Sequence, residues 1–241
     1  MSYWRDKVVL ITGGSAGFGR SLAGAYAQAG AKLVLAARDA NRLDATVRDL
    51  RRENAEVCGV PTDVTDDQQV SALIAQTVSQ FGRIDVLVNN AGRSTRGRVV
   101  DTTPEQFQEL LELNFLSTVR CTRAALPHLI ASRGHLVNVG SLAAKTVTRY
   151  LGAYPASKFP VAAYSQQLRL ELMAEGVHVL LVCPGPIARE DAGQRYATEA
   201  VDLPDSAKRP GGGVRIRGLD PLVVSRRILK ACESRAPELI L

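Results

Sequence analysis

Cysteine and histidine are scarce in this 241-residue sequence, and their scarcity argues against two kinds of site. The four cysteines form no CxxC pair and have no histidine at ligand spacing, so neither a disulfide framework nor a zinc site is expected. The three histidines lie in or beside apolar segments, which favours structural roles over metal binding. We therefore expect no metal, and free buried thiols at Cys58, Cys121, Cys183 and Cys232.

Long apolar runs are missing as well. No stretch approaches the roughly 18 residues of a membrane span. The start MSYWRDK lacks the apolar core of a signal peptide. Hydrophobic residues at 46% and charged residues at 22% are typical of a soluble globular protein, and no shift in composition marks a second domain. We expect a cytoplasmic protein with no integral membrane segment.

Aromatic residues make up only 5% of the chain, which bears on the meaning of its net charge of +6. Such a charge permits attraction to nucleic acid. Arginines cluster at 47–52 and 93–98, but neither group is interleaved with the aromatics that a single-strand binder uses. The first group fits a solvated helix face, and the second fits either a surface loop or the charged rim of a pocket. We expect no nucleic-acid partner.

What the chain does have is a regular alternation of short apolar runs with amphipathic stretches. Strand-like runs occupy 7–12, 32–37, 56–61, 84–89, 134–140, 177–183 and 237–241, and helical patterns occupy 16–30, 40–54, 66–82 and 103–131. Several runs are apolar on both faces, as expected when helices cover both sides of a parallel sheet. The pattern predicts one α/β domain over residues 1–241, with a doubly wound parallel sheet. Only residues 184–219, rich in Pro, Gly and charge, break the rhythm, and we expect a substrate loop or lid there.

A glycine-rich stretch, TGGSAGFG at 12–19, joins the first predicted strand to the first predicted helix. Glycines there allow a tight turn and let backbone N–H groups approach a pyrophosphate, while the helix N-terminus favours negative charge. The stretch therefore predicts a dinucleotide site. Its expected contacts are Gly13, Ser15, Gly17, Phe18 and Gly19.

The second predicted strand ends in VLAAR, at Arg38. An acidic residue at this place would bond the ribose hydroxyls of NAD, whereas an arginine can pair with the 2′-phosphate of NADP. Ala37 stands where the carboxylate would be, so we predict NADP(H), with Ser15 and Asn41 as helpers. Two alternatives stay open: Arg38 is a surface charge, or Asp39 weakens the phosphate site.

The stretch AYPASKF at 153–159 sets Tyr154 one helical turn before Lys158. Positions i and i+4 share one helix face, and a nearby cation favours the ionised form of a phenol, whose free pKa is about 10. Pro155 is favoured in the first turn of a helix, so it predicts a helix that begins at or next to Tyr154. Taken alone, the spacing also fits two exposed side chains whose contact stabilises a helix.

Taken in order, these motifs resemble those of the short-chain dehydrogenases/reductases (SDRs) of the classical type. The resemblance covers nearly the whole chain and rests on TGGSAGFG, Asp63, NNAG at 89–92, Asn114, Ser141, and Tyr154 with Lys158. Asn114 lies 27 residues before Ser141, which lies 13 before Tyr154, and these intervals agree with the family. The resemblance implies the sheet order 3-2-1-4-5-6-7 and a homodimer or homotetramer.

The resemblance also implies a role for each residue. Tyr154 would exchange a proton with the substrate oxygen, Lys158 would lower the pKa of that phenol and bond the nicotinamide ribose, and Ser141 would polarise the carbonyl. Asn114 would hold a water that passes protons to Lys158. Further cofactor contacts are implied at Asp63, Val64, Asn90, Ala91, Gly92, Tyr154, Lys158, Pro184, Gly185 and Ile187. Arg189 stands where the family often has a threonine that holds the nicotinamide amide, so this chain does not offer that hydroxyl.

The predicted function is that of an NADP(H)-dependent carbonyl reductase, which interconverts a carbonyl and a secondary alcohol by hydride transfer. GGSAGFG, LAARDANRL and YPASKF are most similar to family members that act on hydrophobic ketones, which suggests a ketosteroid, 3-ketosphingoid or 3-oxoacyl substrate. The alternative is a non-catalytic NADP(H)-binding sensor or scaffold. Such a protein would be expected to have a broken Ser141, Tyr154 and Lys158 set, which is intact here.

Overall fold

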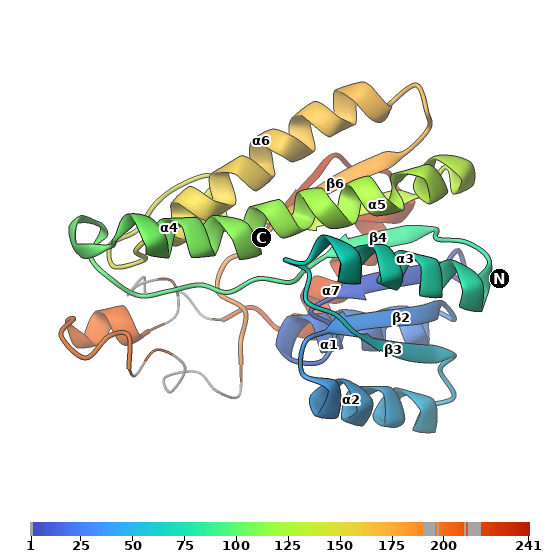
Figure 1. Cartoon of the computed structure of the whole chain (residues 1–241), viewed down its shortest axis with the longest axis horizontal. Coiled ribbons are helices and arrows are strands. Elements are labelled where there is room, and N and C mark those ends of the chain that lie inside the picture. The colour runs from blue at the N-terminus through green and yellow to red at the C-terminus, as the bar shows by residue number, and fades with distance from the viewer. Residues whose placement is uncertain (1, 190–195, 197, 210, 212–217) are drawn as a thin grey trace.

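Seven parallel strands form the centre of the molecule, and helices cover both faces of the sheet (Figure 1). The computed structural model describes residues 2–189, 196, 198–209, 211 and 218–241. The strand order is β3-β2-β1-β4-β5-β6-β7, which confirms the predicted doubly wound fold. The strands are β1 (Val8–Thr12), β2 (Lys32–Ala37), β3 (Val57–Pro61), β4 (Val86–Asn89), β5 (His135–Val139), β6 (His178–Cys183) and β7 (Glu238–Ile240).

Strand β1 shows why the sheet is buried on both faces. All five of its residues are buried, and successive side chains of a strand point to opposite faces. Leu10 belongs to the apolar cluster that includes Leu73, whereas Ile11 belongs to the cluster that includes Leu22. Each fully buried leucine or isoleucine contributes about 1.5–3 kcal/mol to folding. The continuous apolar runs of the sequence therefore form a sheet covered on both sides.

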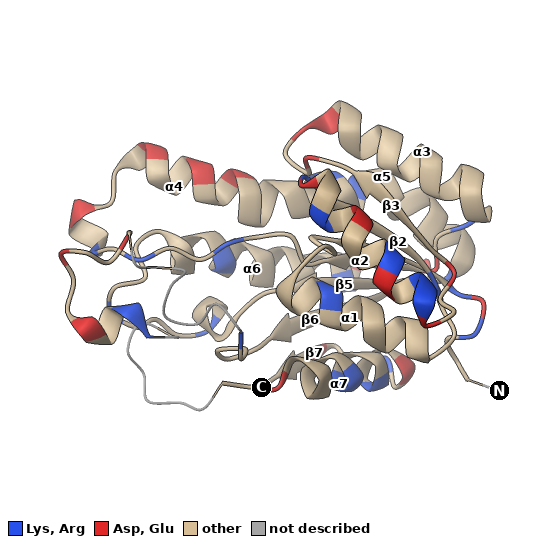
Figure 2. Ribbon diagram, turned by 90° about the horizontal axis from the view of Figure 1, so that it is seen from below, with Lys and Arg blue, Asp and Glu red and all other residues tan. Residues whose placement is uncertain are grey.

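The two clusters assign the helices to the two faces. One face is covered by α1 (Gly17–Gln28), α2 (Ala40–Arg52) and α7 (Pro221–Glu233). The other is covered by α3 (Asp67–Phe81), α5 (Ser117–Ser132) and α6 (Tyr154–Leu172). Acidic and basic residues are interspersed over the ribbon in the view of Figure 2, on α2 and α7 among others. No described helix is both long and apolar enough to cross a membrane.

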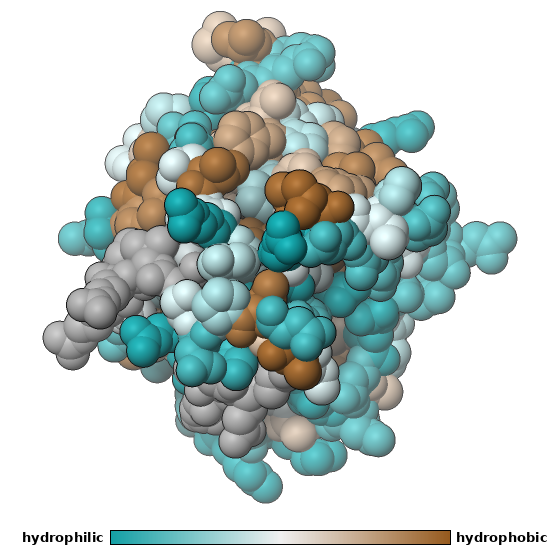
Figure 3. Space-filling model, turned by 90° about the vertical axis from the view of Figure 1, so that its left-hand side faces the viewer, coloured by the Kyte–Doolittle hydropathy of each residue, from teal (hydrophilic) through white to brown (hydrophobic). Residues whose placement is uncertain are grey.

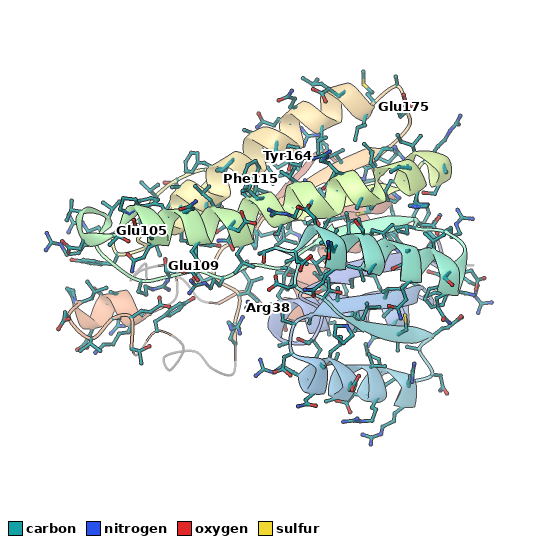
Figure 4. The ribbon with its side chains drawn as sticks, in the orientation of Figure 1. Arg38, Glu105, Glu109, Phe115, Tyr164 and Glu175 are labelled. Atoms are coloured by element: carbon teal, nitrogen blue, oxygen red, sulfur yellow. The ribbon has the colours of Figure 1, made fainter. Side chains whose placement is uncertain are left out.

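The predicted helix over 103–131 begins as expected but is not continuous. Thr103 caps α4 (Pro104–Leu111) in a reciprocal capping box with Gln106, and proline occupies the first turn. A π-helical segment, η2 (Glu112–Leu116), then separates α4 from α5. Phe115 of this segment packs edge-to-face against Tyr164 of α6, with ring centroids 5.9 Å apart (Figure 4). Hydrophobic periodicity in the sequence cannot reveal a π-helical segment, because the wider turn shifts the helical register over only a few residues.

The predicted lid leaves the sheet after β6 and returns before α7. A parallel bridge between Ile187 and Leu219 closes its base, with Ala188 N–H donating to the Leu219 carbonyl at 2.8 Å. Its described part includes a short 3₁₀ helix, η4 (Asp205–Lys208), which lies at the same end of the molecule as α4 (Figure 1). Residues 190–195, 197, 210 and 212–217 of the predicted lid lie outside the described residues. Two more short 3₁₀ helices, η1 (Val99–Asp101) and η3 (Leu142–Ala144), follow β4 and β5.

His135 and His178 open β5 and β6, at the N-terminal edge of the sheet. Their Nδ1 atoms are 2.9 Å apart, and each Nε2 has its own partner: the Tyr3 hydroxyl for His135 and the Ala236 carbonyl for His178. Burial, followed by the neighbouring His178, lowers the pKa of His135 to about 3. Every ring nitrogen of these two histidines therefore has a hydrogen-bond partner. All four cysteines are free thiols, but Cys58 is only partly buried, whereas Cys121, Cys183 and Cys232 are buried as expected.

Candidate active site

A pocket of about 530 Å³ opens at the carboxyl ends of the strands, where ligands bind in open α/β sheets. It is lined by most of the predicted site residues: Gly13, Phe18, Gly19, Asn90, Ala91, Gly92, Ser141, Tyr154, Lys158, Pro184, Gly185 and Ile187. Five predicted contacts do not line this pocket: Ser15, Gly17, Arg38, Asp63 and Val64. Ser15, Arg38, Asp63 and Val64 follow β1, β2 and β3, on the side of the sheet edge away from Tyr154, and Gly17 is the first residue of α1.

The glycine turn between β1 and α1 has glycines at positions where a side chain would be strained or would clash. Gly13 and Gly17 have φ of 66° and 51°, in the left-handed region that favours glycine. A Cβ atom on Gly19 would lie 2.1 Å from the Gly13 carbonyl oxygen. The N-cap of α1 is Ala16, whose methyl group cannot accept a hydrogen bond from the first N–H groups of the helix. This cradle fits the diphosphate of a dinucleotide.

Thr12, which the sequence analysis did not single out, ties the second cofactor motif to the glycine turn. Its hydroxyl accepts hydrogen bonds from the backbone N–H groups of Asn90 and Ala91, both at 3.0 Å. The Asn90 side chain in turn donates to the Thr12 carbonyl at 2.9 Å. The motif NNAG therefore braces the cradle from the neighbouring strand. A threonine at a strand end carries no signal of such a role in sequence.

At the outer end of the site, Arg38 projects from the end of β2 (Figure 4). Its side chain is 67% exposed, and its Nη1 lies 3.9 Å from Oδ2 of Asp63. Burial raises the pKa of Asp63, but hydrogen bonds from Thr65 and the charge of Arg38 outweigh it, so the pKa is lowered overall. Asp39 caps α2, accepting from Arg42 N–H at 3.0 Å. Val64 is buried beneath this surface.

Tyr154 is the first residue of α6, with Pro155 directly behind it, as the sequence predicts. Lys158 follows one turn later and is only 5% exposed. Its ammonium donates to the Val139 carbonyl at 2.9 Å, and burial lowers its pKa to about 8. Both side chains line the same pocket, with Lys158 buried and Tyr154 partly buried.

Ser141 lies just beyond β5, where it lines the pocket and begins η3. Its hydroxyl accepts a hydrogen bond from Ala143 N–H at 3.1 Å. The following N–H, of Leu142, donates to the Pro184 carbonyl at 2.9 Å, which joins the loops after β5 and β6. The serine therefore caps a short helix and still presents its hydroxyl to the pocket.

Asn114 stands behind the pocket, in the π-helical segment η2, and is 1% exposed. Its amide exchanges two hydrogen bonds with the backbone of Arg93, at 2.9 and 2.8 Å, and donates a third to the Ser157 hydroxyl at 2.8 Å. A Cβ atom on Gly92 would lie 2.7 Å from Asn114 Oδ1 and 3.7 Å from Lys158 Nζ. The contact with Asn114 is too close for a side chain at position 92, whereas the contact with Lys158 is of ordinary length.

The arginine-rich loop after β4 contacts the described part of the predicted lid. Arg96 is 7% exposed, donates to the Ala207 carbonyl at 2.8 Å, and stacks 3.7 Å from the Tyr196 ring. The hydroxyls of Ser94 and Tyr196 lie 2.5 Å apart, and Arg93 pairs with Glu109 of α4 at 2.7 Å. The run at 93–98 thus fits the pocket-rim alternative. Tyr196 and Lys208 also line the pocket, and no sequence pattern marked them.

Comparison with known proteins gives consistent matches. Residues 7–200 match the family model described as short chain dehydrogenase. "Dehydrogenase/reductase SDR family member 7B" of Bos taurus is 32% identical over 247 residues, covering 100% of this chain and 74% of that protein.

Two solved structures are similar over nearly their whole length. A short-chain dehydrogenase/reductase from Burkholderia phymatum, in complex with NAD, has a TM-score of 0.87 at 28% identity, covering 100% of this chain and 90% of that one. L-Sorbose reductase from Gluconobacter frateurii, complexed with NADPH and L-sorbose, has a TM-score of 0.86 at 26% identity, covering 98% and 95%. The two neighbours therefore hold different nicotinamide cofactors.

Proposed function

The chain belongs to the short-chain dehydrogenase/reductase family, and on that premise we propose that it is an NADP(H)-dependent oxidoreductase acting on a carbonyl and its secondary alcohol. One observation carries the proposal. Ser141, Tyr154 and Lys158 line a single pocket that also contains the glycine cradle. A protein that only sensed the cofactor would have no need to keep all three groups in place.

In the proposed mechanism, bound NADP(H) supplies or takes up the hydride. Tyr154 gives a proton to the substrate oxygen in reduction and removes it in oxidation. Lys158, with a pKa of about 8, is mostly charged at pH 7 and favours the ionised phenol. The position of Tyr154 at the start of α6 adds the positive end of the helix dipole.

Ser141 and Asn114 complete the proposed machinery. The hydroxyl of Ser141 hydrogen-bonds the carbonyl oxygen on which negative charge develops. Asn114 reaches the backbone of Arg93 and the hydroxyl of Ser157, beside the ammonium of Lys158. We propose that it positions a water that returns protons to Lys158.

The choice of NADP(H) over NAD(H) is supported by Arg38. Its guanidinium stands at the end of β2, largely exposed, where the 2′-phosphate would approach. The carboxylate of Asp39, which could weaken a phosphate site, accepts a hydrogen bond from the Arg42 N–H as the N-cap of α2. Because NADPH favours reduction in a cell, we propose that the protein acts as a reductase.

The walls of the pocket support a hydrophobic ketone of ketosteroid, 3-ketosphingoid or 3-oxoacyl type as substrate. Apolar side chains from the segments that follow β5 and β6 line it: Leu142, Ala143, Leu151, Pro186 and Ile187. Four valines of the loops that follow β4, β5 and β6 are also exposed: Val99, Val100, Val147 and Val201. Figure 3 views the end of the molecule that carries α4 and the lid, where apolar residues group among polar ones.

We also propose a homodimer or homotetramer that forms through α6 and the long helix before it. Large apolar side chains on α6 and at its C-terminal end are exposed: Phe159 at 45%, Leu170 at 74% and Met173 at 75%. Burying them against a second copy would remove apolar surface from water.

Turnover of a panel of hydrophobic ketones with NADPH, by wild type and Tyr154→Phe, tests the proposed function. Removing the phenolic proton should lower kcat at least about a hundredfold, in line with typical losses of a general acid. NADPH binding, followed by fluorescence, should remain close to that of wild type. If wild type binds NADPH but is as inert as the variant across the panel, the non-catalytic sensor replaces the reductase.

A further inference from the structure

Three side chains of the kinds that bind metal ions meet at the N-terminal edge of the sheet, opposite the pocket at the carboxyl ends of the strands. His135 and His178 open β5 and β6, and Cys232 lies in the last turn of α7. One nitrogen of each histidine and Sγ of Cys232 all lie within 4.8 Å of one another. The three residues are buried, at 2%, 6% and 0% exposure. Tertiary packing thus brings together ligands that have no metal-binding spacing in the sequence.

The hydrogen bonds of the two histidines show which nitrogen of each ring faces the other ring. The Ala236 carbonyl can only accept, so His178 Nε2, 2.8 Å away, carries a proton. Burial lowers the pKa of both histidines, so both rings are neutral and His178 Nδ1 is an acceptor. His135 Nδ1, 2.9 Å away, therefore donates to it, and His135 Nε2 accepts from the Tyr3 hydroxyl at 2.7 Å. A single proton lies between the two Nδ1 atoms.

The outer hydrogen bonds of the two rings are those expected behind metal-bound histidines. A histidine that binds a metal usually donates its other ring N–H to a polar group, which fixes the ring. The Ala236 carbonyl is such a partner for His178, and the Tyr3 hydroxyl becomes one for His135 when its proton moves to Nε2. Nitrogens about 2.0–2.1 Å from one ion lie roughly 3.3–3.6 Å apart. The two Nδ1 atoms need to separate by only roughly half an ångström to admit an ion between them.

The net charge of the cluster restricts the kind of ion that it can bind. Burial raises the pKa of Cys232 to about 12, so its side chain is a neutral thiol. An ion bound by the sulfur replaces the thiol proton, while the proton of His135 moves from Nδ1 to Nε2. A singly charged ion leaves the net charge of this buried site unchanged, whereas a doubly charged ion adds a buried positive charge. Of the ions that suit thiolate and imidazole ligands, Cu⁺ is singly charged.

The charged residues near the cluster also oppose a doubly charged ion. Cations act on the histidines from three elements of the chain: Lys7, Arg169 and Arg235. The carboxylate of Glu233 acts on Cys232, but it accepts the Trp4 indole N–H at 2.6 Å. An added positive charge would therefore be repelled by the nearby cations.

We propose that His135, His178 and Cys232 form a binding site for Cu⁺, with the two Nδ1 atoms and the thiolate as its three ligands. One ion enters and one proton leaves, and no electron is transferred. The bound ion links β5 and β6 to α7. It stabilises the folded chain, because the unfolded chain does not hold the three ligands together. The site is independent of the proposed function, since it lies at the other edge of the sheet from the pocket.

Anaerobic titration of the purified protein with Cu⁺, in competition with a coloured Cu⁺ chelator, tests the assignment. Wild type should bind one Cu⁺ per chain and gain the ultraviolet absorption of a copper–thiolate bond, and Cys232→Ala should lose both. His178→Gln, whose amide can still donate to the Ala236 carbonyl, should bind Cu⁺ more than about a hundredfold more weakly, beyond the range for losing a bond behind a ligand. Tyr3→Phe removes only such an outer bond and should weaken binding by about ten- to a hundredfold.

Cys121→Ala is the matched control, because it removes another buried thiol, at 2% exposure. It should leave the affinity and the absorption unchanged. Melting curves should show that each variant is folded, and Cu⁺ should raise the melting temperature of wild type but not that of Cys232→Ala. Failure of wild type to take Cu⁺ from the chelator would overturn the inference, as would wild-type affinity in Cys232→Ala or His178→Gln. Tighter binding of Zn²⁺ than of Cu⁺ would also overturn it, since the site would then accept a doubly charged ion.

Discussion

The proposed cofactor half of the site, at the ends of β1 and β2, consists of backbone and exposed charge, whereas the proposed catalytic half, around the ends of β4 and β5, consists of polar side chains that are buried or partly buried. In the cofactor half, Gly19 has no side chain and leaves no room for one, and the side chain of Arg38 is 67% exposed. Asn114 and Lys158, at 1% and 5% exposure, exemplify the second. In the catalytic half, the groups proposed for chemistry also make the hydrogen bonds of the fold. In the cofactor half, an exposed side chain such as Arg38 should allow affinity to be changed without stability, whereas Gly19 should affect both.

The largest effect on stability is expected from Gly19→Ala. The added methyl carbon would lie 2.1 Å from the Gly13 carbonyl oxygen and 2.6 Å from Asn90 Nδ2, so the turn must move. Overpacking of this kind costs about 1–3 kcal/mol or more, and we expect at least the upper value together with loss of NADPH binding. Denaturant unfolding and NADPH titration measure both.

Gly24→Ala is the control for this change, because it lies in the same helix and a Cβ atom there would meet no atom within 4 Å. It should raise the free energy of unfolding by about 0.5–1 kcal/mol, the helix propensity of alanine over glycine. If Gly19→Ala were as stable as Gly24→Ala, the cradle would not depend on close backbone contact.

A smaller, pH-dependent effect is expected from Lys158→Met. Burial lowers the pKa of Lys158 to about 8, while an unfolded lysine keeps its ordinary value near 10.5. Between these values the unfolded chain binds more protons, so this group raises the stability of wild type as pH rises. Below about pH 8 the cost of the buried charge is present in full.

The stability of Lys158→Met relative to wild type should therefore fall by about 2–3 kcal/mol between pH 7 and pH 10. Urea unfolding of both proteins at the two pH values measures the difference, in which all other titrating groups cancel. A stability difference that does not depend on pH would mean that Lys158 has an ordinary pKa. Burial of charge would then not distinguish the two halves of the site.

The smallest effect on stability is expected from Arg38→Ala, which should change the free energy of unfolding by less than about 0.5 kcal/mol because the side chain is exposed. The KM for NADPH should nevertheless rise about tenfold or more, whereas that for NADH should change little. Steady-state kinetics with the two cofactors separate the effects. Arg42→Ala, which removes an arginine paired with Asp39 at 3.7 Å, should change neither KM. Equal rises for both cofactors would take Arg38 out of the 2′-phosphate site.

Much of the fold could be predicted from local sequence. Thr103 and Pro104 predicted where α4 begins, and Pro155 predicted that α6 begins at or next to Tyr154. Caps and first turns depend on a few neighbouring residues, so the sequence carries them directly. The π-helical segment that places Asn114 was not predictable, since the bonds of Asn114 reach Arg93 and Ser157, far away in the chain.

By itself, the sequence determined the order of strands and helices, the glycine turn and the set of polar groups available for chemistry. These follow from periodicity, from turn residues and from the identity of side chains at the strand ends. Only the tertiary structure decided that Lys158 is buried with a lowered pKa and that His135, His178 and Cys232 lie together. Burial and contact between distant segments depend on how the whole chain packs, which no short stretch of sequence contains.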